Sequence, residues 1–155
     1  MKFSSIIMLL LGMIVYPFTQ VAAQEVKADD VLGVWLNEDK DAHIQIYKEG
    51  DKYFGKIVWL KEPIDPETGK PKVDDKNDDP KLQKRPIMGL LLLKDFVFDG
   101  DDEWEDGEIY DPKSGNTYSC YMEFEDEDNK DLLKIRGYIG FSLLGRTTYW
   151  TRVKK

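Results

Sequence analysis

Few side chains in this chain have the chemistry of catalysis or metal binding. It contains one histidine, His43, and one cysteine, Cys120. A zinc site needs three or four such ligands, and an activated nucleophile needs a base beside it. The sequence has no G-x-S-x-G, H-E-x-x-H or phosphate-binding glycine motif. We therefore predict no catalytic residue, no metal site and no cofactor, and we expect the protein not to be an enzyme.

Both residues have ordinary structural interpretations. Cys120 alternates on one face of a predicted strand with Tyr118, Met122 and Phe124. A reactive thiolate needs a basic, partly exposed setting, so this pattern predicts a small core residue. His43 falls on the polar face of its predicted strand, which is typical of a surface residue.

Acidic residues offer a second kind of chemistry in the long connection 61–85. Asp75, Asn77 and Asp79 have the spacing that opens a calcium-binding loop. Proline stands where that motif requires glycine, and again where it requires the bidentate glutamate. We interpret the segment as a solvated acidic loop, although connections of this length are often functional or mobile.

Two loops share the pattern D-P-x-[S/T]-G-x, at residues 65–70 and 111–116. Aspartate accepts hydrogen bonds from amides ahead of it, proline presets the first corner, and glycine adopts the positive φ that ends the turn. This mechanism accounts for each residue type, so we favour structural turns over a polar ligand loop.

The amino terminus has the pattern of a secretory signal peptide, residues 1–23. Lys2 is the charged region, 6–15 the apolar region, and Val21-Ala22-Ala23 the cleavage motif before Gln24. The apolar run is shorter than the roughly 20 residues of a bilayer span. We therefore expect a periplasmic or secreted protein with no stable membrane anchor after cleavage.

Residues 24–155 have the size of a single domain. The whole chain has a formal net charge of −8, and the leader carries one basic and no acidic residue, so the remainder carries −9. This charge is unfavourable for nucleic-acid phosphates and for anionic membranes, and nucleic acid is excluded as a partner. With one cysteine the domain cannot close an internal disulfide.

Apolar and polar residues alternate along most of the mature chain, which predicts about eight short strands. Regular turns between them favour an all-β barrel or sandwich, and a closed antiparallel barrel removes exposed strand edges. The predicted strands begin at 33 and continue at 42–47, 53–60, 90–98, 103–110, 116–125, 132–141 and 145–153.

Six segments follow one another in a recognisable order: G-V-W-L-N at 33–37, Y-F-G-K-I-V-W at 53–59, D-P-E-T-G-K-P at 65–71, R-P-I-M-G-L at 85–90, G-E-I-Y-D-P-K-S-G-N-T-Y at 107–118, and R-G-Y-I-G-F-S-L-L-G-R-T-T-Y-W-T-R at 136–152. Together they resemble the bacterial family called domain of unknown function 2147. The resemblance implies a secreted or periplasmic protein with one lipocalin-like β-barrel. It implies no activity and no functional residues.

A similarity to lipocalins rests on Gly33 and Trp35, which match their G-x-W motif, and on Arg152 of the last strand. The resemblance implies that Arg152 stacks on Trp35 as a structural plug, a contact of about 1 kcal/mol. The long segment 61–85 departs from lipocalins, whose first long loop lies between the first two strands.

A small closed barrel can hold one small apolar or amphipathic ligand. The candidates for the wall of such a site lie on the more apolar faces of their predicted strands: Trp59, Tyr118, Phe124 and Phe141. The alternative is that these residues fill the core. The protein is then an envelope-associated interaction or structural module, whose partner is an envelope protein.

Overall fold

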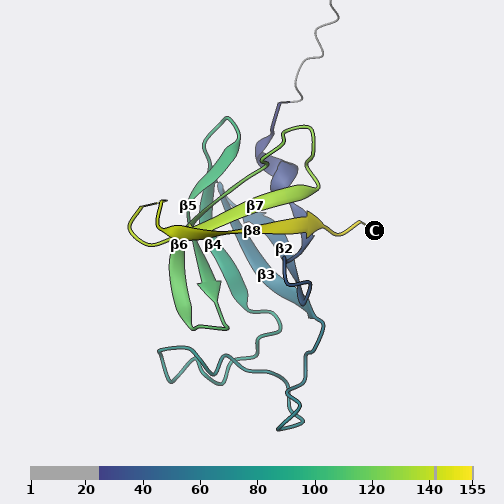
Figure 1. The fold of residues 1–155 in the computed structure, drawn as a ribbon, viewed down its shortest axis with the longest axis vertical. Helices are drawn as coiled ribbons and strands as arrows, with labels where there is room; N and C mark the ends of the chain where they lie inside the picture. The colour runs from purple at the N-terminus through teal and green to yellow at the C-terminus, as the bar shows by residue number, and fades with distance from the viewer. Residues whose placement is uncertain (1–24, 142, 155) are drawn as a thin grey trace, which may run out of the picture.

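The chain folds into eight antiparallel strands that close into one barrel in the computed structural model (Figure 1). The structure describes residues 25–141 and 143–154. A short 3₁₀ helix, η1 (Ala28–Val31), precedes the barrel. The strands are β1 (Gly33–Leu36), β2 (Ala42–Glu49), β3 (Lys52–Leu60), β4 (Leu91–Phe98), β5 (Glu103–Asp111), β6 (Asn116–Glu123), β7 (Leu132–Tyr138) and β8 (Gly145–Arg152).

Each strand pairs with its neighbour in sequence, and β1 pairs with β8 to close the sheet. The predicted all-β barrel of about eight strands is confirmed. Closure pairs the two outer strands at Trp35 with Arg152 and at Leu36 with Thr151, which shortens the sheet edge that is left for pairing with another chain. The predicted leader, residues 1–23 with cleavage before Gln24, lies outside the described residues. None of the described helices has the length and apolarity needed to cross a bilayer.

One end of the barrel is filled by aromatic side chains. Trp35, Trp104 and Phe124 pack together, with ring centroids 6.3 Å apart for Trp35 and Phe124 and 5.4 Å apart for Trp104 and Phe124. Helix η1 covers this end, and the Trp104 indole donates to the Ala28 carbonyl at 3.0 Å. We call it the closed end.

Arg152 completes the closed end. Its guanidinium carbon lies 4.2 Å from the centroid of the Trp35 ring. Its nitrogens donate to the carbonyls of Asp30, Leu32 and Lys130 at 2.7 to 3.1 Å. Gly33 has a φ of 138°, and a Cβ there would lie 3.0 Å from Arg152 Nη1. Glycine is therefore required for both the backbone conformation and the close approach of the arginine.

A β-bulge interrupts the pairing of β2 with β3. His43 pairs with Trp59 whereas Ile44 pairs with Ile57, so Val58 is the extra residue. A bulge inverts the inward and outward alternation beyond it. Leu60 consequently points into the barrel and Trp59 points out.

The connection from β3 to β4, residues 61–90, lies at the end of the barrel opposite η1 (Figure 1). Two isolated bridges organise it, Ile64 with Pro71 and Val73 with Pro86. The two D-P-x-[S/T]-G-x segments are turns, as predicted: the first aspartate of each accepts from backbone amides two and three residues ahead or from the hydroxyl three residues ahead.

Candidate functional site

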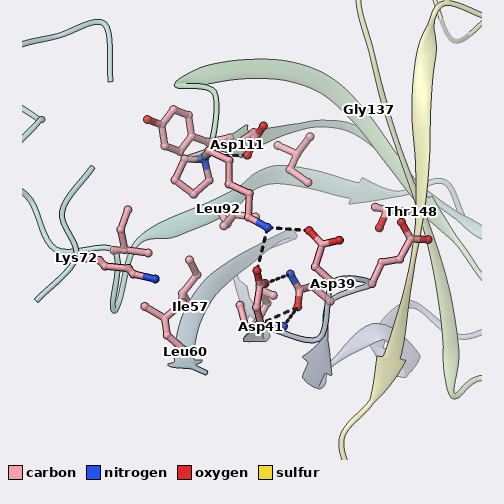
Figure 2. A pocket seen from close by; sticks show the side chains of 18 of the residues that line it. Asp39, Asp41, Ile57, Leu60, Lys72, Leu92, Asp111, Gly137 and Thr148 are labelled. Carbon is pink, nitrogen blue, oxygen red and sulfur yellow. Dashed lines mark hydrogen bonds and ion pairs between the residues drawn. The ribbon is translucent and has the colours of Figure 1, made fainter. Parts of the chain in front are cut away.

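The half of the barrel opposite the closed end is hollow. A cavity of about 1130 Å³ lies between the strands and the long connection (Figure 2). This volume is slightly larger than that of most small-molecule sites, which have about 300 to 1,000 Å³. Every strand from β2 to β8 contributes an apolar side chain to its wall: Ile44, Ile57, Leu60, Leu92, Ile109, Tyr118, Ile135 and Trp150.

Charged side chains form the mouth of the cavity. Lys113, from the turn between β5 and β6, reaches across to the loop between β1 and β2. Its ammonium group lies 2.7 Å from Asp39 Oδ2 and 2.9 Å from Asp41 Oδ2 (Figure 2). The hydrogen bond to Asp39 is the main cause that raises the pKa of Lys113. We call these three residues the mouth bridge.

Asn37 positions the acidic side of the mouth bridge. Its amide nitrogen donates to Asp41 Oδ1 at 2.7 Å, and its amide oxygen accepts from the Asp41 and Ala42 backbone amides. Burial opposes the ionisation of Asp41, but the hydrogen bonds from Asn37 and Lys113 outweigh it. The pKa of Asp41 therefore lies below its ordinary value of 3.8.

A buried polar network fixes the long connection beside the cavity. Asp74 is fully buried and accepts from the Tyr110 hydroxyl at 2.6 Å, from Asn77 Nδ2 at 3.0 Å and from Arg85 Nε at 2.8 Å. Tyr110 belongs to β5, so the network ties the connection to the barrel wall. Among the described residues, no buried side-chain nitrogen or oxygen lacks a partner.

The segment with calcium-like spacing is part of this network. Asn77 uses its amide nitrogen on Asp74 and Tyr110, and its oxygen accepts from the Asp79 backbone amide. These bonds organise the turn. Within the described part of the chain, no three His, Cys, Asp or Glu side chains are grouped as metal ligands would be.

The four predicted wall residues have four different environments. Tyr118 lines the cavity. Phe124 is buried in the aromatic cluster of the closed end, away from the cavity. Trp59 lies on the outer surface, 4.4 Å from the His43 ring, because of the bulge in β3. Phe141 is exposed in the connection between β7 and β8. Strand β7 ends at Tyr138, three residues earlier than the end predicted from alternation.

Neither of the two chemically versatile residues faces the cavity. His43 packs against Trp59 outside the barrel, with the two rings tilted by 35°. Cys120 is fully buried, and this burial strongly raises the pKa of its thiol. The thiol is therefore protonated at neutral pH and unreactive in the folded protein.

A family model described as "Uncharacterized protein conserved in bacteria (DUF2147)" matches residues 33–152. The chain belongs to the DUF2147 family. This confirms the family resemblance found in the sequence.

A solved structure described as "Protein HP1028 from the human pathogen Helicobacter pylori belongs to the lipocalin family" is similar to this DUF2147 barrel. The TM-score is 0.67 with 21% sequence identity, over 81% of this chain and 84% of that chain. At this identity, the similarity shows a shared lipocalin-like fold. A comparison with curated proteins found no match.

The mouth bridge of this DUF2147 protein was not among the sequence predictions. Lys113 lies in a turn whose motif is fully explained by local geometry, and Asp39 and Asp41 lie in a short acidic loop. The two loops are about 70 residues apart in sequence, and their contact follows from the closure of the barrel. The sequence offered one indication of this contact: Lys113 lies in a turn at the same end of the predicted barrel as the loop that contains Asp39 and Asp41.

Proposed function

We propose that this DUF2147 protein binds a small apolar or amphipathic molecule in the hollow half of its barrel. The observation that carries the proposal is the unequal filling of the interior. Aromatic side chains fill the closed end, whereas apolar side chains from seven strands surround open space at the other. An apolar wall with a few polar groups at the entrance is typical of small-molecule sites.

The mouth suits the polar end of an amphipathic ligand. Thr148 and Lys72 line the cavity together with the mouth bridge, so a head group meets hydroxyl, ammonium and carboxylate groups there. The apolar tail would contact Ile57, Leu60 and Leu92 in the interior (Figure 2).

The proposal is of a binding protein and not of an enzyme. His43 and Cys120, the residues with the most versatile chemistry, both lie away from the cavity. It also includes a periplasmic or secreted location, supported by the leader pattern of residues 1–23. Sequencing the amino terminus of exported protein tests the location, and a retained Met1 would contradict it.

The first experiment is to purify the protein under native conditions and extract it with organic solvent. Native and denaturing mass spectrometry then show whether a small molecule leaves with it. A stoichiometric apolar or amphipathic molecule supports the proposal and identifies the ligand class. An empty barrel that also fails to bind apolar probes contradicts it, and favours the alternative of an envelope-associated interaction module.

A variant can separate ligand binding from folding. Thr148 is half-buried on β8 and lines the cavity, so Thr148→Trp places an indole in the open space. Thr151→Trp is the matched control, because Thr151 is exposed on the same strand. We expect Thr148→Trp to reduce binding of the neutral dye N-phenylnaphthylamine by roughly tenfold or more through steric exclusion. Thr151→Trp should bind as the unmodified protein does, and equal binding by both variants would place the dye elsewhere.

A further inference from the structure

The connection between β7 and β8, residues 139–144, exposes an unusual amount of apolar surface. Ile139 is 68% exposed, Phe141 56%, Leu143 82% and Leu144 62%. Single exposed apolar residues are normal on a protein surface, but a contiguous group is typical of an interaction site. We call these four side chains the apolar tip.

The backbone of the apolar tip is largely satisfied within the loop. The Ile139 amide donates to the Leu144 carbonyl at 3.1 Å, and the Leu144 amide donates to the Phe141 carbonyl at 3.1 Å. Arg136 Nη2 donates to the Leu143 carbonyl at 3.3 Å. A loop with these internal bonds can enter an apolar environment at a lower desolvation cost than an open one.

The hairpin that carries the apolar tip is basic in an otherwise acidic protein. From residue 132 to residue 155 the sequence has six basic and no acidic residues, whereas the whole chain has a net charge of −8. Two of the basic residues, Arg136 and Arg146, lie at the base of the tip. The Arg146 side chain is 81% exposed, and its Nη2 forms a long ion pair of 3.9 Å with Glu38 Oε2.

We propose that the apolar tip docks on a phospholipid surface, with Arg146 against the lipid phosphates. The apolar side chains of the tip would enter the acyl-chain layer, and the arginine behind them would lie at the level of the anionic head groups. The positive charge of Arg146 is complementary to the anionic head groups, although the net charge of the molecule is not. A protein partner with a plain apolar groove would not need Arg146.

The apolar tip is also continuous with the mouth of the cavity. Ile139 and Leu144 of the tip also line the cavity, together with Arg146 at the base of the tip. Docking would therefore place the mouth at the lipid surface, where amphipathic molecules are concentrated. The docking itself does not depend on the proposed ligand.

The test is flotation of the protein with vesicles of phosphatidylethanolamine, with and without phosphatidylglycerol. The amino terminus of each preparation is determined by mass spectrometry, so that any leader is equal in all samples. We expect binding to both kinds of vesicle, stronger with phosphatidylglycerol. No binding to either would overturn the proposal.

Variants assign the binding to the tip. Phe141→Ser with Leu143→Ser changes only exposed side chains and should lower vesicle binding by roughly tenfold. The matched control, Ile64→Ser with Leu82→Ser, removes two apolar side chains that are 48% and 38% exposed in the long connection. An equal loss in both double variants would show that the tip is not the docking site.

Charge variants test the role of Arg146. Arg146→Gln should lower binding to vesicles with phosphatidylglycerol by roughly fivefold, and lower binding to phosphatidylethanolamine, which has a phosphate but no net charge, to a smaller extent. Lys84→Gln, a change of the same charge on the exposed long connection, should have little effect. An equal effect of both would indicate general electrostatics and contradict the proposal.

The cavity proposal can be scored separately in the same proteins. Binding of N-phenylnaphthylamine in solution should be unchanged in the Phe141 and Leu143 double variant. Loss of vesicle binding with retained dye binding supports a tip that is distinct from the cavity. Dye binding with no vesicle binding by the unmodified protein overturns only the docking proposal. Vesicle binding without dye binding overturns only the cavity proposal.

Discussion

Trp35 shows how individual residues close one end of the barrel. Its indole nitrogen donates to the Val31 carbonyl at 2.9 Å, and Arg152 covers its ring. The side chain is fully buried between η1, the aromatic cluster and the last strand. A buried tryptophan with a satisfied nitrogen contributes both apolar area and a hydrogen bond, and leaves no polar group unpaired.

Truncating this residue should strongly destabilise the fold. We expect Trp35→Ala to lower the free energy of unfolding by about 3 to 5 kcal/mol, because it leaves a cavity in the aromatic cluster. Urea unfolding followed by circular dichroism measures the change. Trp59→Ala is the matched control, since Trp59 is 40% exposed, and it should cost about 1 kcal/mol or less. An unchanged unfolding midpoint for Trp35→Ala would reject the plug.

Asp41 gives the mouth bridge a pH dependence with a defined sign. Its folded-state pKa is lower than its ordinary value of 3.8. The stability that ionised Asp41 contributes is therefore present above 3.8 and is lost as the pH falls below that value, through the folded-state pKa. Asp41→Asn should remove this part of the acid sensitivity.

Urea unfolding measures the free energy of unfolding at about pH 6 and at about pH 3. We expect this free energy to fall less between the two pH values in the Asp41→Asn variant than in the unmodified protein. Asp78→Asn, an exposed change of the same charge in the long connection, should lose as much as the unmodified protein. Identical pH profiles for all three proteins would show that the mouth bridge does not contribute.

At the scale of elements, the long connection 61–90 is ordered by a few buried polar contacts and not by strands. Asp74 accepts hydrogen bonds from three side chains, and Arg85 lies over the Tyr110 ring, 5.3 Å from its centroid. Gly115 has a φ of 79°, and a Cβ there would collide with the Lys76 carbonyl. The connection is therefore fitted closely against the turn between β5 and β6.

Removing Asp74 should release this connection and leave the barrel folded. Asp74→Ala leaves the Tyr110 hydroxyl and the Arg85 guanidinium without their buried partner, which typically costs about 3 to 5 kcal/mol. We expect faster tryptic cleavage within 61–85, measured by mass spectrometry, while the circular dichroism of the strands is retained. Asp75→Ala, at an exposed position, should be cleaved at the unmodified rate. Equal protection of both variants would show that other contacts hold the connection.

For the molecule as a whole, barrel closure depends on its shortest strand pairing. Strand β1 pairs with β8 at two positions, whereas β2 pairs with β3 at eight. Arg152 lies at this seam and binds carbonyls on both sides of it. The Arg152 side chain therefore contributes more hydrogen bonds at this β1–β8 seam than the short backbone pairing suggests.

Hydrogen exchange should be fastest at this seam among the strands, because local opening there breaks the fewest contacts. We expect peptides from β1 and the end of β8 to exchange sooner than those from β2 and β3 in mass-spectrometric measurements. Arg152→Met should raise exchange at the seam by roughly tenfold or more. Lys154→Met, which alters a mostly exposed neighbour, should not. Uniform exchange around the barrel would contradict the weak seam.

The sequence by itself determined the family, the fold class and most strand boundaries. Alternation is a local signal, and each strand from β2 to β8 has one buried face, so periodicity located them to within a few residues. The G-x-W motif and Arg152 likewise identified the first and last strands, which meet where Arg152 covers Trp35. The D-P-x-[S/T]-G-x turns followed from residue types alone.

Tertiary structure decided which residues face the cavity. Because of one bulge in β3, Leu60 faces the cavity and Trp59 faces outward. Phe141 lies in a loop because β7 ends early, and Phe124 packs in the aromatic cluster of the closed end. Lys113 meets Asp39 and Asp41 only because closure brings distant loops to one mouth. Periodicity reports which face of a strand is inward, but the position of a residue along the barrel axis depends on strand register and packing, which are non-local.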